Sequence, residues 1–398
     1  MAKKKYILIT VSGQDQPGIT SNLLKIIGDN DHEIADMGQS VTHGLLSLSI
    51  LINTEESGKN TPVLKDLLFE AKNLGLSLEF EVLENGDKTI DQNDKFILNC
   101  VAVDRITARF FHEVSSVLAV NNINILRIDN VSPPNFNSIE VTTTLPKGLE
   151  LNAIKKQLIA VSNKHKIDVA FIKDNVFRRN KRLIVLDMDS TLIQTEVIDE
   201  MAESHGVGTE VKAVTEKAMN GEIGFDESIN QRVSKLKGMK VTQLQEISDR
   251  LPITPGAEDF IKTVKSLGYK VALISGGFTF FTDTIKEKLN LDYAFANELE
   301  IVAGELTGKL TGTIINAEQK ATILKLITQQ ENISLEQVVA IGDGANDLPM
   351  LSAAGLGIAF HAKEIVKKKA GQNMSHGPMT SILYFLGIPG PVENIQGH

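Results

Sequence analysis

The chain has 398 residues, of which 42% are hydrophobic and 23% charged, and its net charge at pH 7 is −9. This length predicts two or three domains, and the composition is that of an ordinary globular protein. The negative net charge argues against nucleic acid as the main partner. No apolar run approaches the roughly 18 residues of a membrane helix, so no membrane partner is expected.

Cysteine usage and the first residues indicate the compartment. The only cysteine, Cys100, lies in an apolar stretch, which excludes an intramolecular disulfide and predicts a buried, inert thiol. Residues 1–5 lead into a strand pattern without the apolar segment of a signal peptide. We therefore expect a cytoplasmic protein.

Residues 1–86 predict a βαββαβ unit, in which a turn at Asp15-Gln-Pro-Gly18 opens the first helix. The expected elements are a strand at 6–11, a helix ending near 28, strands at 33–43 and 45–53, a helix at 62–75 and a strand at 76–83. A polar stretch, residues 84–94, follows this unit.

The same order of elements recurs in residues 95–174, where an offset of 91 residues places Ile34 on Ile125. The expected elements are a strand at 96–103, a helix at 107–120, strands at 123–130 and 138–145, a helix at 151–162 and a strand at 167–172. Identities between the copies are sparse, so the repeat is one of pattern.

These tandem units resemble ACT domains, small modules that often sense amino acids. The second copy has Ile106-Thr-Ala-Arg109 where the first has its Asp-x-Pro-Gly turn. The resemblance implies a homodimer and an amino-acid effector, with serine as the candidate. A pair of units that only dimerises the protein is the alternative.

A basic segment, residues 178–182, follows the second unit, with Lys173 nearby. It is either an anion site or a solvated linker, and charge runs of this length favour the linker.

Residues 181–398 have the pattern of a doubly wound α/β domain, with apolar strands alternating with helices. The strands are expected at 183–186, 270–274, 338–341 and 357–360. A helix-rich insert, about 197–250 and called the cap below, separates the first two strands. Residues 299–315, with three glycines, predict a β-hairpin excursion.

Polar residues follow three of these strands, where parallel sheets place their ligands. They are Asp187 and Asp189 after the first strand, Ser275 and Gly276 after the second, and Asp343, Asn346 and Asp347 after the third, with Lys320 opening the preceding helix. Clustered carboxylates repel one another, and Mg²⁺ is the cation that suits such oxygens. Serine, lysine and glycine N–H groups suit phosphate. The pattern predicts a phosphate site beside Mg²⁺.

Other sites with similar residues are disfavoured. Leu192 stands where an EF-hand loop requires glycine, and a strand rather than a helix precedes the acidic residues. The phosphate-binding Gly-x-x-x-x-Gly-Lys-Ser/Thr motif is absent from the sequence.

The four motifs in this order resemble the haloacid dehalogenase superfamily, and the second aspartate is typical of its phosphatases. The match is closer still to the phosphoserine phosphatases within it, through Asp187-Met-Asp-Ser-Thr191 and Ser275-Gly-Gly-Phe278. The resemblance implies a Rossmann-like core with a helical cap. It also implies Mg²⁺-dependent hydrolysis of O-phosphoserine to serine and phosphate, the last step of serine biosynthesis.

The resemblance also implies a role for each residue. Asp187 is the nucleophile that becomes an aspartyl-phosphate, and Asp189 is the general acid and then the base. The expected Mg²⁺ ligands are Asp187, the Asp189 carbonyl and Asp343. Asp347 either supports the metal from outside the first ring of ligands or pairs with Lys320. The expected phosphate-binding groups are Ser275, the Gly276 N–H, Lys320 and Asn346.

The cap is expected to supply substrate specificity. Arg232 would pair with the substrate carboxylate and Glu196 with its ammonium group. Met219 and Phe225 would form an apolar wall. The alternatives are that Arg232 is a surface residue and that Phe225 belongs to the core of the cap.

Two rival functions remain at this point. One is a phosphatase or phosphotransferase for another small phosphomonoester, which only the cap residues distinguish. The other, of a different class, is a catalytically silent amino-acid sensor, and the intact acidic motifs argue against it.

Overall fold

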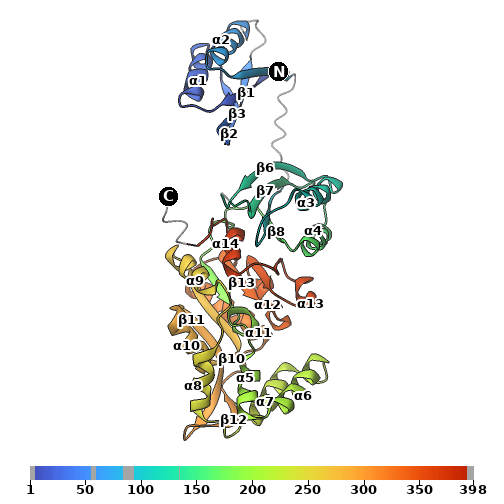
Figure 1. Cartoon of the computed structure of the whole chain (residues 1–398), viewed down its shortest axis with the longest axis vertical. Coiled ribbons are helices and arrows are strands. Elements are labelled where there is room, and N and C mark those ends of the chain that lie inside the picture. The colour runs from blue at the N-terminus through green and yellow to red at the C-terminus, as the bar shows by residue number, and fades with distance from the viewer. Residues whose placement is uncertain (1–4, 55–59, 84–93, 134, 392–398) are drawn as a thin grey trace. The chain divides into compact units, whose positions relative to one another are not determined.

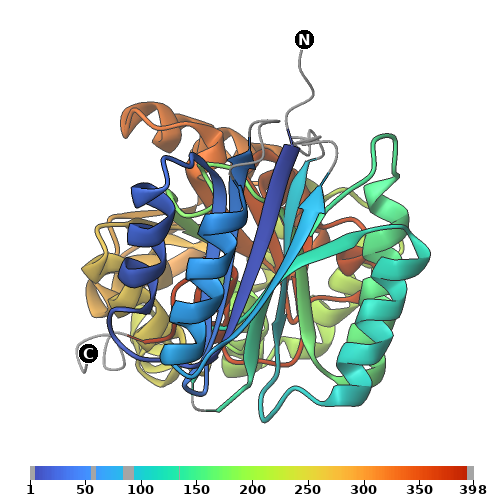
Figure 2. The same cartoon turned by 90° about the horizontal axis from the view of Figure 1, so that it is seen from above.

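The computed structural model describes residues 5–54, 60–83, 94–133 and 135–391. The chain divides into two compact units, residues 1–92 and residues 93–398 (Figures 1 and 2). Among the described residues, no helix is long and apolar enough to cross a membrane.

The described part of the first unit is a βαββαβ fold with an antiparallel sheet in the order β2-β3-β1-β4. Its elements are β1 (Lys5–Gln14), α1 (Ile19–Asp29), β2 (Ile34–Thr42), β3 (Leu45–Thr54), α2 (Asn60–Asn73) and β4 (Ser77–Leu83). Alternate residues of β1, namely Ile7, Ile9 and Val11, are buried in one core with apolar residues of both helices. Gly18 precedes α1 with a φ of 98°, which glycine adopts without steric cost.

The second βαββαβ unit repeats this topology, with the sheet order β6-β7-β5-β8. Its elements are β5 (Lys95–Val101), α3 (Ala108–Val120), β6 (Asn124–Asn130), β7 (Ser138–Thr144), α4 (Leu151–His165) and β8 (Asp168–Lys173). Thr107 replaces the glycine turn at the start of α3, where its side chain accepts a hydrogen bond from the Phe110 N–H. The repeat predicted from the pattern is therefore present as a repeat of topology.

The described residues from 181 onward form a seven-stranded sheet in the order β12-β11-β10-β9-β13-β14-β15. The strands are β9 (Leu183–Leu186), β10 (Lys270–Phe278), β11 (Tyr293–Val302), β12 (Glu305–Thr311), β13 (Val338–Gly342), β14 (Leu356–Phe360) and β15 (Gln372–Met374). All neighbours are parallel except β11 and β12. β9 lies at the centre and is fully buried, which explains its unbroken apolar run. The predicted fold class, a parallel-sheet core preceded by two βαββαβ units, is confirmed.

Helices cover the sheet and form the cap. Residues 197–250, all described, fold into the four cap helices α5 (Val197–His205), α6 (Gly208–Met219), α7 (Phe225–Lys235) and α8 (Val241–Arg250). The others are α9 (Ala257–Ser266), α10 (Thr279–Leu289), α11 (Ala317–Gln330), α12 (Leu348–Ala353), α13 (Glu364–Lys367) and α14 (Ile382–Phe385). Figure 1 shows α6 and α7 side by side at the end of the molecule that also carries β12.

The structure corrects three details. β11 begins at Tyr293 and pairs with β10 before it turns into the hairpin, and the short strand β15 was not predicted. The basic segment is only partly solvated, because Arg178 is 3% and Lys181 6% exposed, whereas Arg179, Asn180 and Arg182 are exposed. Arg178 pairs with Glu140, and the Lys181 ammonium donates to the Glu336 carbonyl oxygen. These partners lie far away in the sequence, so a count of local charge could not find them.

The second βαββαβ unit is joined to the seven-stranded sheet through β8. The Asp168 carboxylate accepts hydrogen bonds from the backbone N–H groups of residues 375, 376 and 377, at 2.7, 3.0 and 3.0 Å. The Gln372 side chain bonds both the N–H and the carbonyl of Phe171, at 2.8 and 2.9 Å. Since these groups are mostly buried, the junction stabilises residues 94–391 as one body.

Candidate active site

The site begins at the carboxyl end of the central strand. Asp187 follows β9, is 4% exposed, and its N–H donates to the Ile341 carbonyl of β13 at 3.0 Å. The chain then turns sharply, with Ser190 at a φ of 57°. After this turn, Asp189 Oδ1 accepts a hydrogen bond from the Val197 N–H at the start of α5, at 2.8 Å.

A buried lysine lies beneath the two motifs. Lys320, which is 1% exposed, donates from Nζ to Asp187 Oδ1 and to Asp347 Oδ1, both at 2.7 Å. Asp347 also accepts from the Gly344 N–H at 2.9 Å through its other oxygen. Lys320 therefore fixes the relative position of two carboxylates that would otherwise repel each other.

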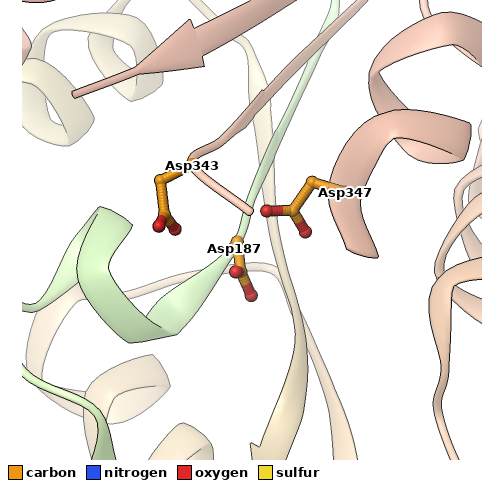
Figure 3. Close-up of side chains that lie close together, drawn as sticks. All are labelled: Asp187, Asp343 and Asp347. Carbon is orange, nitrogen blue, oxygen red and sulfur yellow. The ribbon is translucent and has the colours of Figure 1, made fainter. Parts of the chain in front are cut away.

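Three carboxylates could hold a cation. Asp187, Asp343 and Asp347 each place an oxygen within 4.8 Å of the others, and Figure 3 shows the three side chains around a common space. Thr191 donates to Asp343 Oδ1 at 3.0 Å and orients that carboxylate. An all-oxygen set of this kind fits a hard divalent ion.

Electrostatics supports the same conclusion. Burial, together with the negative charge of Asp347, raises the pKa of Asp187 well above its usual value. Burial, with smaller contributions from neighbouring acids, raises the pKa of Asp189 to about 7 and that of Asp343 to about 6. Burial alone would lower the pKa of Lys320, but its two carboxylate partners raise it above the ordinary value. The carboxylates of the site outnumber the positive charge of Lys320, and a bound cation would supply the missing positive charge.

The end of β10 approaches the acids closely. Ser275 is fully buried, and its hydroxyl donates to Asp189 Oδ2 at 3.3 Å and accepts from the Gly277 N–H at 2.8 Å. A Cβ at Gly277 would lie 2.9 Å from Asp189 Oδ2, so only glycine fits there. A Cβ at Gly276 would lie 3.2 Å from the ring of Phe225 in the cap. The two glycines thus allow Asp189 and the cap to approach this strand end.

A cavity of about 490 Å³ lies between the sheet and the cap. Of the residues selected from the sequence, it is lined by Asp187, Asp189, Glu196, Met219, Phe225, Arg232, Gly276, Asp343 and Asn346. Ser275, Lys320 and Asp347 are buried behind this lining. Met219, at 68% exposed, lies at the mouth rather than in an enclosed wall.

The alternatives for Arg232 and for Phe225 have different outcomes in the structure. Arg232 is half-buried in the cavity lining, where burial lowers its pKa and the charges of Asp199, Glu196 and Asp189 oppose that effect. It is not an ordinary surface residue. Phe225 both lines the cavity and packs against the main core. The two descriptions of Phe225 are therefore compatible.

Sequence reasoning missed part of the lining. Gly277, Ile229 of α7, and Lys363 and Ile365 from the segment after β14 also face the cavity. The rule that ligands lie beyond the carboxyl ends of parallel strands would have indicated the residues after β14. No comparable signal indicated Ile229, because its position depends on how the cap packs.

Comparisons with known proteins agree with this geometry. A model described as haloacid dehalogenase-like hydrolase matches residues 181–355, and two ACT-domain models match residues 5–81 and 100–172. The chain is 36% identical to phosphoserine phosphatase SerB2 of Mycobacterium tuberculosis over 388 residues. This match covers 98% of this chain and 94% of the relative. The chain belongs to the phosphoserine phosphatase family.

Two further relatives of this family support the assignment. The phosphoserine phosphatase of Streptomyces coelicolor is 35% identical over 382 residues, with 96% of this chain and 92% of the relative covered. The crystal structure of a probable phosphoserine phosphatase from Vibrio cholerae matches with a TM-score of 0.60 at 36% identity, covering 77% of this chain and 89% of that one. The family resemblance predicted from the motifs is confirmed, including the two ACT domains.

We predict that Mg²⁺ stabilises the protein more at pH 8 than at pH 5. The folded pKa values of about 7 for Asp189 and about 6 for Asp343 lie above the unfolded value near 3.9. Without metal, the stability from these protonated carboxyls is complete below about pH 4 and is lost as the pH rises through 6 to 7. A cation favours the charged forms, so its effect grows over the same interval.

Thermal unfolding with and without Mg²⁺ measures this difference. At pH 8, saturation to about 100 times Kd is worth about 2.7 kcal/mol, or roughly 4 °C in Tm for the unit of residues 93–398. Near pH 5 we expect less than about half of that shift. Asp343→Asn is expected to remove most of the shift, and an equal shift at both pH values would contradict the prediction.

Proposed function

We propose that the protein hydrolyses O-phospho-L-serine to L-serine and phosphate. The observation that carries the proposal is the composition of one cavity. It combines the Asp187–Asp189 pair with a half-buried arginine, Arg232, and a further acid, Glu196. The pair suits phosphoryl transfer, while Arg232 and Glu196 offer opposite charges to the carboxylate and ammonium groups of an amino acid.

In the first step, Asp187 attacks phosphorus and the bond to the serine oxygen breaks. The departing alkoxide takes a proton from Asp189, whose pKa of about 7 leaves a protonated fraction at neutral pH. Lys320 keeps Asp187 in place through the 2.7 Å contact to Oδ1. The product of this step is an aspartyl-phosphate and free serine.

In the second step, water attacks the aspartyl-phosphate. Asp189, now unprotonated, accepts a proton from that water, and the bond between Asp187 and phosphorus breaks to release phosphate. The phosphoryl oxygens would contact the Gly276 N–H and Asn346, with Ser275 and Lys320 behind them. Both carboxylates then return to their starting protonation states.

The cofactor that fits the acidic cluster is Mg²⁺. Asp187, Asp343 and the Asp189 carbonyl would hold it, and Asp347, which contacts Lys320 at 2.7 Å, would support Asp187 from behind. When bound, the ion neutralises negative charge on both the nucleophile and the phosphate. We propose it as the activating metal.

We further propose the three-domain division of 1–86, 95–174 and 181–398, with the cap at about 197–250. The two ACT domains would join the protein into a homodimer and bind an amino-acid effector at the Asp15–Gly18 turn, where Gly18 lets a ligand approach the backbone. Serine, the product, is the candidate effector. The buried thiol of Cys100 is consistent with the cytoplasm, a reducing compartment.

The reaction itself is tested by phosphate release from O-phosphoserine, O-phosphothreonine and glucose 6-phosphate. We expect O-phosphoserine to be preferred, activity to require Mg²⁺, and Asp187→Asn to lower turnover by about 10³-fold or more. The variant should melt at a temperature close to that of the parent protein. Preference for another substrate would support the rival hypothesis of a phosphatase for another small phosphomonoester. Phosphate trapped on a peptide that lacks Asp187 would refute Asp187 as the nucleophile.

Arg232→Ala is expected to separate the substrates. Loss of a charge-assisted pair should lower kcat/KM for O-phosphoserine by about 100-fold, while p-nitrophenyl phosphate, which has no carboxylate, should change less than about threefold. The matched control is Arg250→Ala in the same cap, because Arg250 is 61% exposed and pairs with Glu200. Equal losses on both substrates would assign Arg232 to structure or to the phosphate.

Serine inhibition tests the role of the ACT domains. We expect serine to inhibit the full chain more strongly than a chain that begins at residue 94, by about 5–150-fold in affinity. The cut is placed there because the second unit is bonded to the seven-stranded sheet through Asp168 and Gln372. If both chains respond alike and competitively, the first ACT domain is a scaffold.

A further inference from the structure

The β11–β12 hairpin contacts the cap through its backbone. An antiparallel bridge joins Glu305 of the hairpin to Lys240, between α7 and α8. The hydrogen bonds are Gly238 N–H to Leu306 O at 2.8 Å, Leu306 N–H to Met239 O at 2.9 Å and Val241 N–H to Gly304 O at 3.0 Å. Figure 1 shows β12 beside α7. The cap segment 238–241 is therefore paired to an extension of the seven-stranded sheet.

Apolar packing strengthens the same contact. Leu306 is 2% exposed, and Leu236 and Met239, which follow α7, are fully buried in the same core cluster. Burial of a leucine side chain is worth about 1.5–3 kcal/mol. The hairpin therefore fixes the C-terminal end of α7.

Gly308 sets how close the two elements come. It is buried in β12, and a Cβ there would lie 3.0 Å from the Lys237 Cβ and 3.2 Å from the Ser234 carbonyl oxygen. Its φ of +84° is also a conformation that favours glycine. Any side chain at this position would move the hairpin away from the end of α7.

The cavity residues of α7 depend on that distance. Phe225, Ile229 and Arg232 all belong to this helix and line the cavity. Arg232 lies only two residues before Ser234, the residue whose backbone approaches Gly308. A displacement of the helix end would therefore move the guanidinium relative to Asp189 and Glu196.

We propose that the β11–β12 hairpin, through the close approach of Gly308 to α7, positions Arg232 and so sets the preference for a substrate with a carboxylate. Gly308 touches no substrate and acts only through Arg232. The inference rests on the proposed function, because it assigns Arg232 to the substrate carboxylate.

The test is Gly308→Ala with two controls for backbone strain, Gly268→Ala and Gly312→Ala. The control glycines have φ values of +83° and +74°, but no described atom beyond their chain neighbours lies within 4 Å of a Cβ at either position. All three variants therefore share the backbone strain, and only Gly308→Ala meets the cap. Any difference between Gly308→Ala and its controls reports the contact.

For Gly308→Ala we expect KM for O-phosphoserine to rise about tenfold or more, since a displacement near 1 Å can cost up to about 100-fold. The kcat/KM for p-nitrophenyl phosphate should stay within about twofold, as should both substrates in the controls. In an Arg232→Ala background, Gly308→Ala should cause no further loss, because the two changes share one cause. Lys237→Gly, which removes the nearest Cβ, should partly restore Gly308→Ala.

Leu306→Ala is a second variant, which loosens the same contact without adding atoms and should show the same substrate-selective loss. Equal losses on both substrates, a Gly308→Ala protein that matches its controls, or additivity with Arg232→Ala would overturn the proposal. Hydrogen exchange of the α7 amides separates this from failure of the proposed function. We expect faster hydrogen exchange of the α7 amides in Gly308→Ala, but not in the controls, whatever substrate the enzyme prefers. Unchanged exchange would refute the proposal that the hairpin holds α7 in place.

Discussion

The site depends on one buried ion-pair arrangement, in which Lys320 donates to both Asp187 and Asp347 at 2.7 Å. A buried lysine without partners would lose its charge, and two buried carboxylates without a cation would take up protons. Together the three groups fix the ends of β9 and β13 relative to α11. Asp187 and Asp347, together with Asp343, then surround a space that suits a divalent ion.

The site has two sides, one formed by the carboxyl ends of the sheet strands and the other by the cap. In the proposed reaction, the sheet side supplies groups that act on any phosphomonoester. Lys320 and Thr191 hold Asp187 and Asp343 by hydrogen bonds, and Gly277 permits the close approach of Asp189. In the function proposed above, the cap side supplies the groups that distinguish substrates, and their positions depend on how the cap helices pack. On that proposal, the position of the cap contributes to specificity together with Arg232, and the β11–β12 hairpin contacts the cap beside α7.

The two βαββαβ units share a topology but differ in their attachment. The second unit is bonded to the seven-stranded sheet through Asp168 and Gln372, so it behaves as part of the hydrolase body. The first unit is a separate compact body with its own core. It also retains the glycine turn that suits a ligand, whereas the second has a threonine cap at the same place. This contrast favours a sensing role for the first unit and a structural role for the second.

The sequence by itself determined the βαββαβ repeat, the polar motifs that follow three of the strands, and which acidic residues cluster. These follow from local periodicity and from the rule that parallel strands end at one edge of a sheet. Only the tertiary structure decided that Arg178 is buried against Glu140, that Ile229 and Lys363 line the cavity and that Gly308 meets α7. The physical reason is that each of these depends on a contact between elements distant in the chain, whose packing distance no local pattern encodes.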